Sequence, residues 1–195
     1  MSSSSPKRRP SEVPGDPDAD LLALDLAGAL RGLMERYGAQ VYRYCCEALR
    51  DETLAQDVHQ QVFIQVHRDL PRFEGRSLVR TWLFAIARHR VLDAAKSRSR
   101  ARAHVEDDET ADAPDPRPPA GERIDDARLR EALAACLGEL AEHIRSAVLL
   151  RYQQGFSYED MAEVCSEKAN TLEARVRRAL PQLRTCIETR TGGAL

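Results

Sequence analysis

Apolar residues recur every three or four positions over most of this chain, a spacing that predicts helices. The segment 53–70 shows it most clearly, with apolar residues at every fourth position: Leu54, Val58, Val62, Val66 and Leu70. Pro71 predicts the end of this helix, because proline has no backbone N–H to donate. Polar residues occupy a neighbouring face that we expect to be exposed: Asp57, Gln61, Gln65 and Arg68.

The preceding segment, 19–49, carries a second apolar stripe. Its members are Leu26, Leu30, Leu33, Met34, Tyr37, Val41, Tyr44 and Cys45. We interpret this stripe as core, packed against the helix of 53–70. Gly38 lies inside the stripe and predicts a break between two helices.

A third helical pattern runs through 79–102 and differs from the others in charge. Its apolar stripe consists of Val79, Trp82, Leu83, Ile86 and Ala87. Residues 72–102 contain nine Lys or Arg against Glu74 and Asp93, a net charge of +7, whereas the whole chain carries −2. A localised cationic helix of this kind is typical of nucleic-acid binding, although an ordinary solvated helix face is equally compatible with the charge alone.

The pattern then stops for about twenty residues. Residues 106–122 contain seven acids, one Arg and several Pro, a composition that disfavours packed structure. We therefore predict a flexible acidic linker at 103–123. The Ser- and Pro-rich residues 1–18 predict a disordered tail. These boundaries leave two compact units, 19–102 and 124–190.

Helical periodicity resumes in the second unit. Its expected inward-facing residues are Leu129, Leu133, Leu137, Leu140, Ile144, Val148, Tyr152, Met161, Ala162, Cys165, Leu172, Val176 and Leu180. Gly155 predicts a turn, and Ser157 predicts the N-terminal cap of a short helix. A second capping box, Asn170 with Glu173, predicts the start of a basic helix. Helix, tight turn and basic helix form a helix-turn-helix pattern.

Composition agrees with an all-α fold made of two small helical domains. Aromatic residues make up only 5% of the chain and charged residues 31%. We find neither an apolar run long enough to cross a membrane nor a signal peptide, and we expect a cytoplasmic protein without membrane insertion. The five cysteines show no zinc-ligand spacing, and we expect free thiols, mostly buried.

Short motifs in the first unit resemble bacterial sigma factors of the sigma-70 family, in particular the small extracytoplasmic-function (ECF) group. They are Arg80-Thr81-Trp82-Leu83, Ile86-Ala87-Arg88 with Asp93, and the upstream run Asp57-Val58-His59-Gln60-Gln61-Val62-Phe63. The second unit resembles the helix-turn-helix that reads the minus-35 promoter element in these proteins. The resemblance covers roughly two-thirds of the chain.

This resemblance implies roles for named residues. The helix of 53–70 would dock on core RNA polymerase through Asp57, Gln60, Gln61 and Arg68. The cationic helix and the loop before it would recognise and melt the minus-10 element through Phe73, Arg80, Trp82, Phe84, Arg88 and His89, with the aromatic rings stacking on bases. A core-anchoring role for Trp82 is an equally good interpretation. Gln61 and His89 stand where the family usually has Glu and Asn.

The second unit would read the minus-35 element through Thr171, Glu173, Ala174, Arg175, Arg177 and Arg178. Glu173 stands where the family usually has Lys or Arg. Either it completes the cap at Asn170, or it points into the major groove. Ser166 replaces the usual turn glycine, and Pro181 lies inside the expected helix.

Three classes of function compete. We find no glycine-rich phosphate loop, metal-ligand cluster or nucleophile–base pair, and we therefore expect neither an enzyme nor a cofactor, metal or small-molecule substrate. A DNA-binding regulator that acts without polymerase explains only the second unit. A sigma factor explains both units. Its partners would be core RNA polymerase and promoter DNA, and an anti-sigma factor is a further candidate.

Overall fold

Helices make up all the regular structure of the part of the chain that is described. The structure is a computed structural model, and it describes residues 16–103 and 124–192. The elements are α1 (Ala19–Leu22), α2 (Leu26–Leu49), α3 (Glu52–Asp69), the 3-10 turn η1 (Leu70–Arg72), α4 (Val79–Ala103), α5 (Ile124–Glu139), α6 (Glu142–Val148), the π-helical turn η2 (Leu149–Gln153), α7 (Tyr158–Cys165) and α8 (Ala169–Thr191). The predicted all-α class is confirmed.

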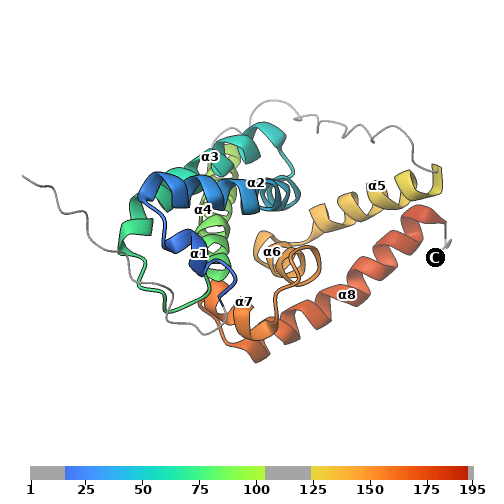
Figure 1. Cartoon of the computed structure of the whole chain (residues 1–195). Helices are drawn as coiled ribbons and strands as arrows, with labels where there is room; N and C mark the ends of the chain where they lie inside the picture. The colour runs from blue at the N-terminus through green and yellow to red at the C-terminus, as the bar shows by residue number, and fades with distance from the viewer. Residues whose placement is uncertain (1–15, 104–123, 193–195) are drawn as a thin grey trace, which may run out of the picture.

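The first half is a bundle in which α2, α3 and α4 pack on one another, and Figure 1 shows α4 behind the other two. The predicted ridge of α3 faces this core, where Val58, Val62 and Val66 are buried. Asp51 caps α3 by accepting a hydrogen bond from the backbone N–H of Leu54 at 2.9 Å. The helix ends at Asp69 and continues as the 3-10 turn that contains Pro71.

The predicted helix break at Gly38 is wrong. Helix α2 runs without interruption from Leu26 to Leu49. A glycine inside a helix costs only about 1 kcal/mol relative to Ala. The buried neighbours Tyr37 and Val41 hold the helix in place, and His59 of α3 contacts the Gly38 carbonyl at 3.1 Å. Packing on α3 therefore overrides the weak local preference.

The end of the predicted disordered tail belongs to the fold. Asp16 accepts a hydrogen bond from the backbone N–H of Val79 at 3.2 Å, at the start of α4. Asp18 is fully buried, and its carboxylate lies 2.5 Å from both the Arg36 guanidinium and the Tyr37 hydroxyl. The polar composition of 1–18 concealed these partners, which lie 18 or more residues away. Residues 1–15 lie outside the described part.

Asp18 gives a direct test of this N-terminal contact. Asp18→Asn is expected to lower the free energy of unfolding by about 1–3 kcal/mol, because the neutral amide has one acceptor oxygen in place of the two that serve the Arg36 guanidinium and the buried Tyr37 hydroxyl. The measurement is urea unfolding followed by circular dichroism. Asp20→Asn is the matched control, since the Asp20 carboxylate also pairs with the Arg36 guanidinium, at 3.4 Å, but is exposed. Equal unfolding midpoints for both variants would contradict this role of Asp18.

The second half contains the predicted helix-turn-helix. Ser157 and Asp160 form a capping box at the start of α7, and Gly155 takes a positive φ of 72° in the turn before it. Ser166 ends α7 with a φ of 53°, the left-handed conformation that glycine usually supplies. The predicted cap at Asn170 is wrong: α8 begins at Ala169 after Lys168, so Asn170 lies inside the first turn.

Several residues expected in the core of the second half lie at the surface. The exposed side chains are Leu129, Leu133, Tyr152 and Leu180. The first-half residue Met34, also expected in the core, is 46% exposed. Pro181 lies inside α8, which nevertheless continues to Thr191. The neighbours Ala179 and Leu183 are buried and anchor the helix on both sides of the proline.

The two halves contact each other across a shared core (Figure 1). The Phe84 ring meets the Phe156 ring edge-on, with centroids 5.2 Å apart. The buried hydroxyls of Tyr44 and Ser146 lie 2.6 Å apart and join α2 to α6. The predicted linker falls almost entirely on 104–123, outside the described residues. The predicted boundaries of the two units therefore stay predictions.

The cysteines differ from the expectation of free thiols. Cys136 of α5 and Cys186 of α8 form a disulfide, while Cys45, Cys46 and Cys165 are free. A separation of 50 residues gives no local sequence signal for such a pair.

Candidate nucleic-acid interface

Helix α3 presents the polar face that the sequence predicts for a partner protein. Asp57, Gln60, Gln61 and Arg68 are exposed. Gln65, expected on the same face, is half-buried instead. It accepts a hydrogen bond from Arg90 and donates one to Asp69, each at 2.6 Å. Gln65 therefore ties α3 to α4 and does not belong to the free face.

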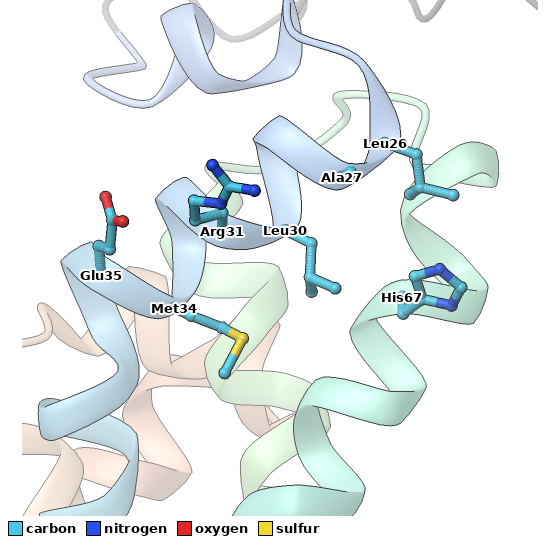
Figure 2. A pocket seen from close by; sticks show the side chains of 7 residues that line it. All are labelled: Leu26, Ala27, Leu30, Arg31, Met34, Glu35 and His67. Atoms are coloured by element: carbon cyan, nitrogen blue, oxygen red, sulfur yellow. The ribbon is translucent and has the colours of Figure 1, made fainter.

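Two open grooves flank α3. The first, of about 500 Å³, lies between the start of α2 and the end of α3, and its lining is Leu26, Ala27, Leu30, Arg31, Met34, Glu35 and His67. Figure 2 shows Leu30 and Met34 of α2 pointing toward α3, which carries His67, while Arg31 and Glu35 project from the other side of α2. The second, of about 610 Å³, lies between α3 and the C-terminal half of α4 and includes Asp57 and Gln61. The polar face of α3 is thus bordered by grooves on both sides.

The predicted DNA-contacting cations of α4 are engaged by other parts of the protein. Arg80 donates a hydrogen bond to the Gln154 carbonyl, and its guanidinium lies 4.2 Å from the centroid of the Phe156 ring. The Arg88 side chain is 13% exposed and lies 3.4 Å from Glu167. Both arginines of the first half therefore contact the second half.

The predicted aromatic contacts divide into two groups. Phe84 is fully buried between Tyr44 and Phe156, so its ring is not accessible to a base in this arrangement. Phe84 lies outside the predicted apolar stripe of α4, and it is buried because it packs against Phe156 of the second half. Phe73 and Trp82 are half-buried and contact each other with centroids 4.9 Å apart. They form a small aromatic surface where the loop meets α4.

His89 is the remaining predicted residue of α4. Its side chain is exposed, and its Nε2 lies 3.2 Å from the Asp93 carboxylate one turn later. The ring is therefore accessible to a ligand from the solvent side. The neighbouring Asp93 carboxylate can accept a hydrogen bond from the ring or from that ligand.

The predicted contact residues of α8 lie near the start of the helix. Thr171, Glu173, Arg177 and Arg178 are exposed, and Ala174 is half-buried. Because α8 does not begin at Asn170, the capping role of Glu173 is excluded and its side chain is exposed instead. Arg175 is not free, since its guanidinium binds both Glu167 carboxylate oxygens, at 2.9 and 2.5 Å.

Glu167 connects the two predicted DNA-reading helices. Its carboxylate meets Arg88 of α4 and Arg175 of α8. The hydrogen bonds from Arg175 are the main cause that lowers the pKa of Glu167. Because the pKa of Glu167 is lowered in the folded protein, its ion pairs stabilise the fold at pH values above the ordinary glutamate pKa of about 4. This stabilisation is lost as the pH falls through the lowered pKa. The bridge is therefore fully charged at neutral pH.

The sequence offered no signal for this interdomain contact. Glu167 stands 79 residues from Arg88, and Gln154 stands 74 residues from Arg80. Glu167 also follows Ser166 in the turn, where an acidic residue is unremarkable. The charge pattern located the cations but not the groups that neutralise them.

Comparison with protein families identifies both halves. Residues 33–101 match the family described as Sigma-70 region 2, and residues 130–183 match Sigma-70, region 4. The RNA polymerase sigma-H factor of Pseudomonas aeruginosa is 32% identical over 171 residues, which cover 82% of this chain and 81% of that protein. The chain belongs to the ECF group of the sigma-70 family.

Other relatives of this sigma factor agree. The ECF sigma factor SigC of Mycobacterium tuberculosis is 36% identical over 157 residues, 77% of this chain and 79% of that protein. The ECF sigma factor SigE of Mycolicibacterium smegmatis is 32% identical over 155 residues. That match covers 78% of this chain but only 59% of the relative, so the chain spans less than two-thirds of SigE.

Two solved structures share the fold of this sigma factor. The sigma factor RpoE of Bartonella quintana, in complex with the anti-sigma factor NepR, matches with a TM-score of 0.69 and 21% identity, over 81% of this chain and 96% of that chain. CnrH in complex with the cytosolic domain of CnrY matches with a TM-score of 0.64 and 22% identity, over 88% and 95%. Within residues 16–103 and 124–192, no helix is long and apolar enough to span a membrane.

Proposed function

We propose that this chain is the subunit that directs core RNA polymerase to a specific set of promoters. It binds the core enzyme, reads the minus-35 and minus-10 elements and starts transcription in the cytoplasm, without catalysing a reaction itself. The observation that carries this proposal is the presence of both sigma regions in one chain. The first region exposes the polar face of α3, and the second exposes the basic start of α8. A regulator that acts without polymerase needs only the second region.

The exposed face of α3 is the proposed docking surface for core polymerase. Its support is the row Asp57, Gln60, Gln61 and Arg68, which the bundle leaves uncovered. The two flanking grooves give a partner helix apolar surface to bury beside this polar row.

The minus-10 element is the proposed ligand of α4 and of the loop before it. Phe73 and Trp82 supply an aromatic surface, Arg80 and Arg88 supply positive charge, and His89 supplies a hydrogen-bonding ring. Base stacking on an aromatic side chain is worth about 1–3 kcal/mol per base. Phe84 is left out of this set, because its ring belongs to the core.

The minus-35 element is the proposed ligand of the start of α8. The exposed set is Thr171, Glu173, Arg177 and Arg178, with Ala174 between them. Arginine in the major groove favours guanine, and a carboxylate accepts a hydrogen bond from cytosine. Glu173 therefore favours a different upstream element from that of relatives with Lys or Arg there.

The structure corresponds to a closed state of this factor. Arg80, Arg88 and Arg175 contact protein groups that DNA would have to replace. We therefore assign promoter binding to an opened state that core polymerase stabilises. An anti-sigma factor is a further expected partner, as in the RpoE–NepR complex of similar fold.

Transcription by purified components tests the proposal. Core polymerase with this chain is expected to yield run-off transcripts from a subset of a promoter library, and core alone is not. A shared pair of minus-35 and minus-10 elements should emerge from the active templates. If the chain binds duplex DNA but no template is transcribed, the regulator that acts without polymerase is the correct alternative.

The docking surface has its own prediction. Replacing Asp57, Gln61 and Arg68 together with Ala is expected to weaken the affinity for core polymerase at least tenfold, because all three lie on one uncovered face. Fluorescence anisotropy of the labelled chain titrated with core measures this. Gln40→Ala with Arg43→Ala on the exposed side of α2 is the control and should bind normally. Equal affinities for both variants would place the docking surface elsewhere.

A further inference from the structure

A disulfide joins the first helix of the second half to its DNA-reading helix. It links Cys136 of α5 to Cys186 of α8, with Cα atoms 5.9 Å apart and a sequence separation of 50. This Cα separation is ordinary for a disulfide. Cys186 lies in the C-terminal half of α8, while the proposed base-contacting residues lie at its start. The bond therefore fixes the base of the helix that presents them.

The two sulfur atoms differ in access. Cys136 is 1% exposed, whereas Cys186 is partly exposed. An external thiol or peroxide therefore reaches Cys186 first. The free cysteines are less suited to such chemistry, because burial raises their pKa values, that of Cys45 to about 12. Thiolate is the reactive form, so the remaining thiols are comparatively inert.

The packing of α5 makes this bond consequential. Within residues 127–139 of α5 the buried residues form a narrow strip of Ala132, Cys136 and Leu137, while Leu129 and Leu133 on another side are more than a third exposed. One ion pair, Glu139 with Arg190 at 2.6 Å, also links α5 to α8, and it is largely exposed. Exposed ion pairs contribute little to stability. The disulfide therefore adds a covalent constraint to the packing of α5 against α8.

A stable disulfide is unexpected in the compartment where RNA polymerase works. Glutathione and thioredoxin systems keep most cytoplasmic thiols reduced, and the disulfides that do form there are commonly redox-sensing. This step rests on the proposed function, which places the chain beside polymerase.

We propose that Cys136 and Cys186 form a reversible dithiol–disulfide site that tightens the second half when oxidised. Hydrogen peroxide oxidises the Cys186 thiol to a sulfenic acid and releases one water. The Cys136 thiol then attacks that sulfur, forms the disulfide and releases the second water, so that two thiols and one peroxide give one disulfide and two waters. A thioredoxin-class dithiol reverses this in two steps. Its first thiolate attacks Cys186 and Cys136 leaves as the thiolate; its second thiol then attacks the mixed disulfide and releases Cys186, so that the dithiol becomes a disulfide.

Counting thiols in the full-length protein tests the site without any mutation. The protein is treated with hydrogen peroxide or with dithiothreitol, unfolded, alkylated and weighed by mass spectrometry. Three alkylated cysteines are expected after peroxide and five after dithiothreitol, with Cys136 and Cys186 as the difference. Five after peroxide would overturn the proposal, as would three after dithiothreitol treatment of the folded protein, which would indicate a purely structural bond.

Thermal unfolding tests the structural consequence. Dithiothreitol is expected to lower the melting temperature of the wild type by at least about 5 °C. Reducing the disulfide opens the loop that it closes and so increases the conformational entropy of the unfolded chain. Cys136→Ser with Cys186→Ser should melt like the reduced wild type and not respond to dithiothreitol. Cys46→Ser is the control and should respond like the wild type. An equal response of the double variant would overturn the assignment.

Run-off transcription separates this proposal from the proposed function. Oxidised wild type is expected to give at least threefold more transcript than reduced wild type from a promoter that depends on its minus-35 element. Equal transcription in both states would overturn the redox role and leave the sigma function intact. Absence of transcripts in both states would contradict the sigma function, whatever the thiol count.

Discussion

Replacing Arg80 and Arg88 together with Ala is expected to slow promoter opening on duplex DNA at least tenfold. Both cations lie on α4, the helix assigned to the minus-10 element. Each lost phosphate contact also lowers the salt dependence of binding by about 0.7–0.9 in the log–log slope. The measurement is the rate of open-complex formation from the fluorescence of a 2-aminopurine placed in the minus-10 element.

A template with a pre-melted minus-10 element separates melting from general affinity. The Arg80 and Arg88 variant should lose much less activity on it, because the strands are already apart. Lys96→Ala with Arg100→Ala is the control, since it removes the same charge from exposed positions of the same helix. Equal losses on duplex and pre-melted templates would show that these arginines act in binding alone.

The second large effect is expected for Glu167→Gln. The neutral side chain no longer holds Arg88 and Arg175 by charge, so the closed state loses its bridge and both cations become available to DNA. A partly exposed bridge of this kind is worth about 1 kcal/mol, which corresponds to a several-fold increase in the opened population. The free chain should therefore bind promoter DNA several-fold more tightly without polymerase, as measured by anisotropy at fixed salt.

Removing any acidic group raises DNA affinity to some extent, and Glu163→Gln controls for this. Glu163 is exposed on α7, close in sequence to Glu167, and no ion pair to Arg88 or Arg175 involves it. Only the excess of Glu167→Gln over Glu163→Gln measures the bridge. If the two variants bind DNA equally, Glu167 does not hold the closed state.

Local periodicity predicted the helices well, because each signal lay within a few residues. The ridge through Val58 and Val62, the stop at Pro71 and the cap at Ser157 all depend on neighbours one turn away. The two errors in helix ends have a tertiary cause. Gly38 stays helical because α3 packs beside it. The predicted cap at Asn170 fails because α8 starts two residues earlier, with Lys168 at the cap position.

The exposed polar face of α3 was predictable from the same periodicity, but the state of the DNA-reading residues was not. Phe84 has the same apolar chemistry whether it stacks on a base or on Phe156. Arg80, Arg88 and Arg175 are cationic whether they bind DNA or protein groups. Their partners, Gln154 and Glu167, belong to no motif that the sequence shows. The disulfide is also a long-range feature, since Cys136 and Cys186 share no local motif.

The distance between the two halves tests the closed state most directly. Fluorescent labels on unnatural amino acids at the exposed positions 39 of α2 and 185 of α8 leave the native cysteines untouched. Single-molecule energy transfer should give one high-efficiency population for the free chain, and the addition of core polymerase should shift it to low efficiency. An efficiency that core polymerase leaves unchanged would contradict the account that polymerase opens this factor for promoter binding.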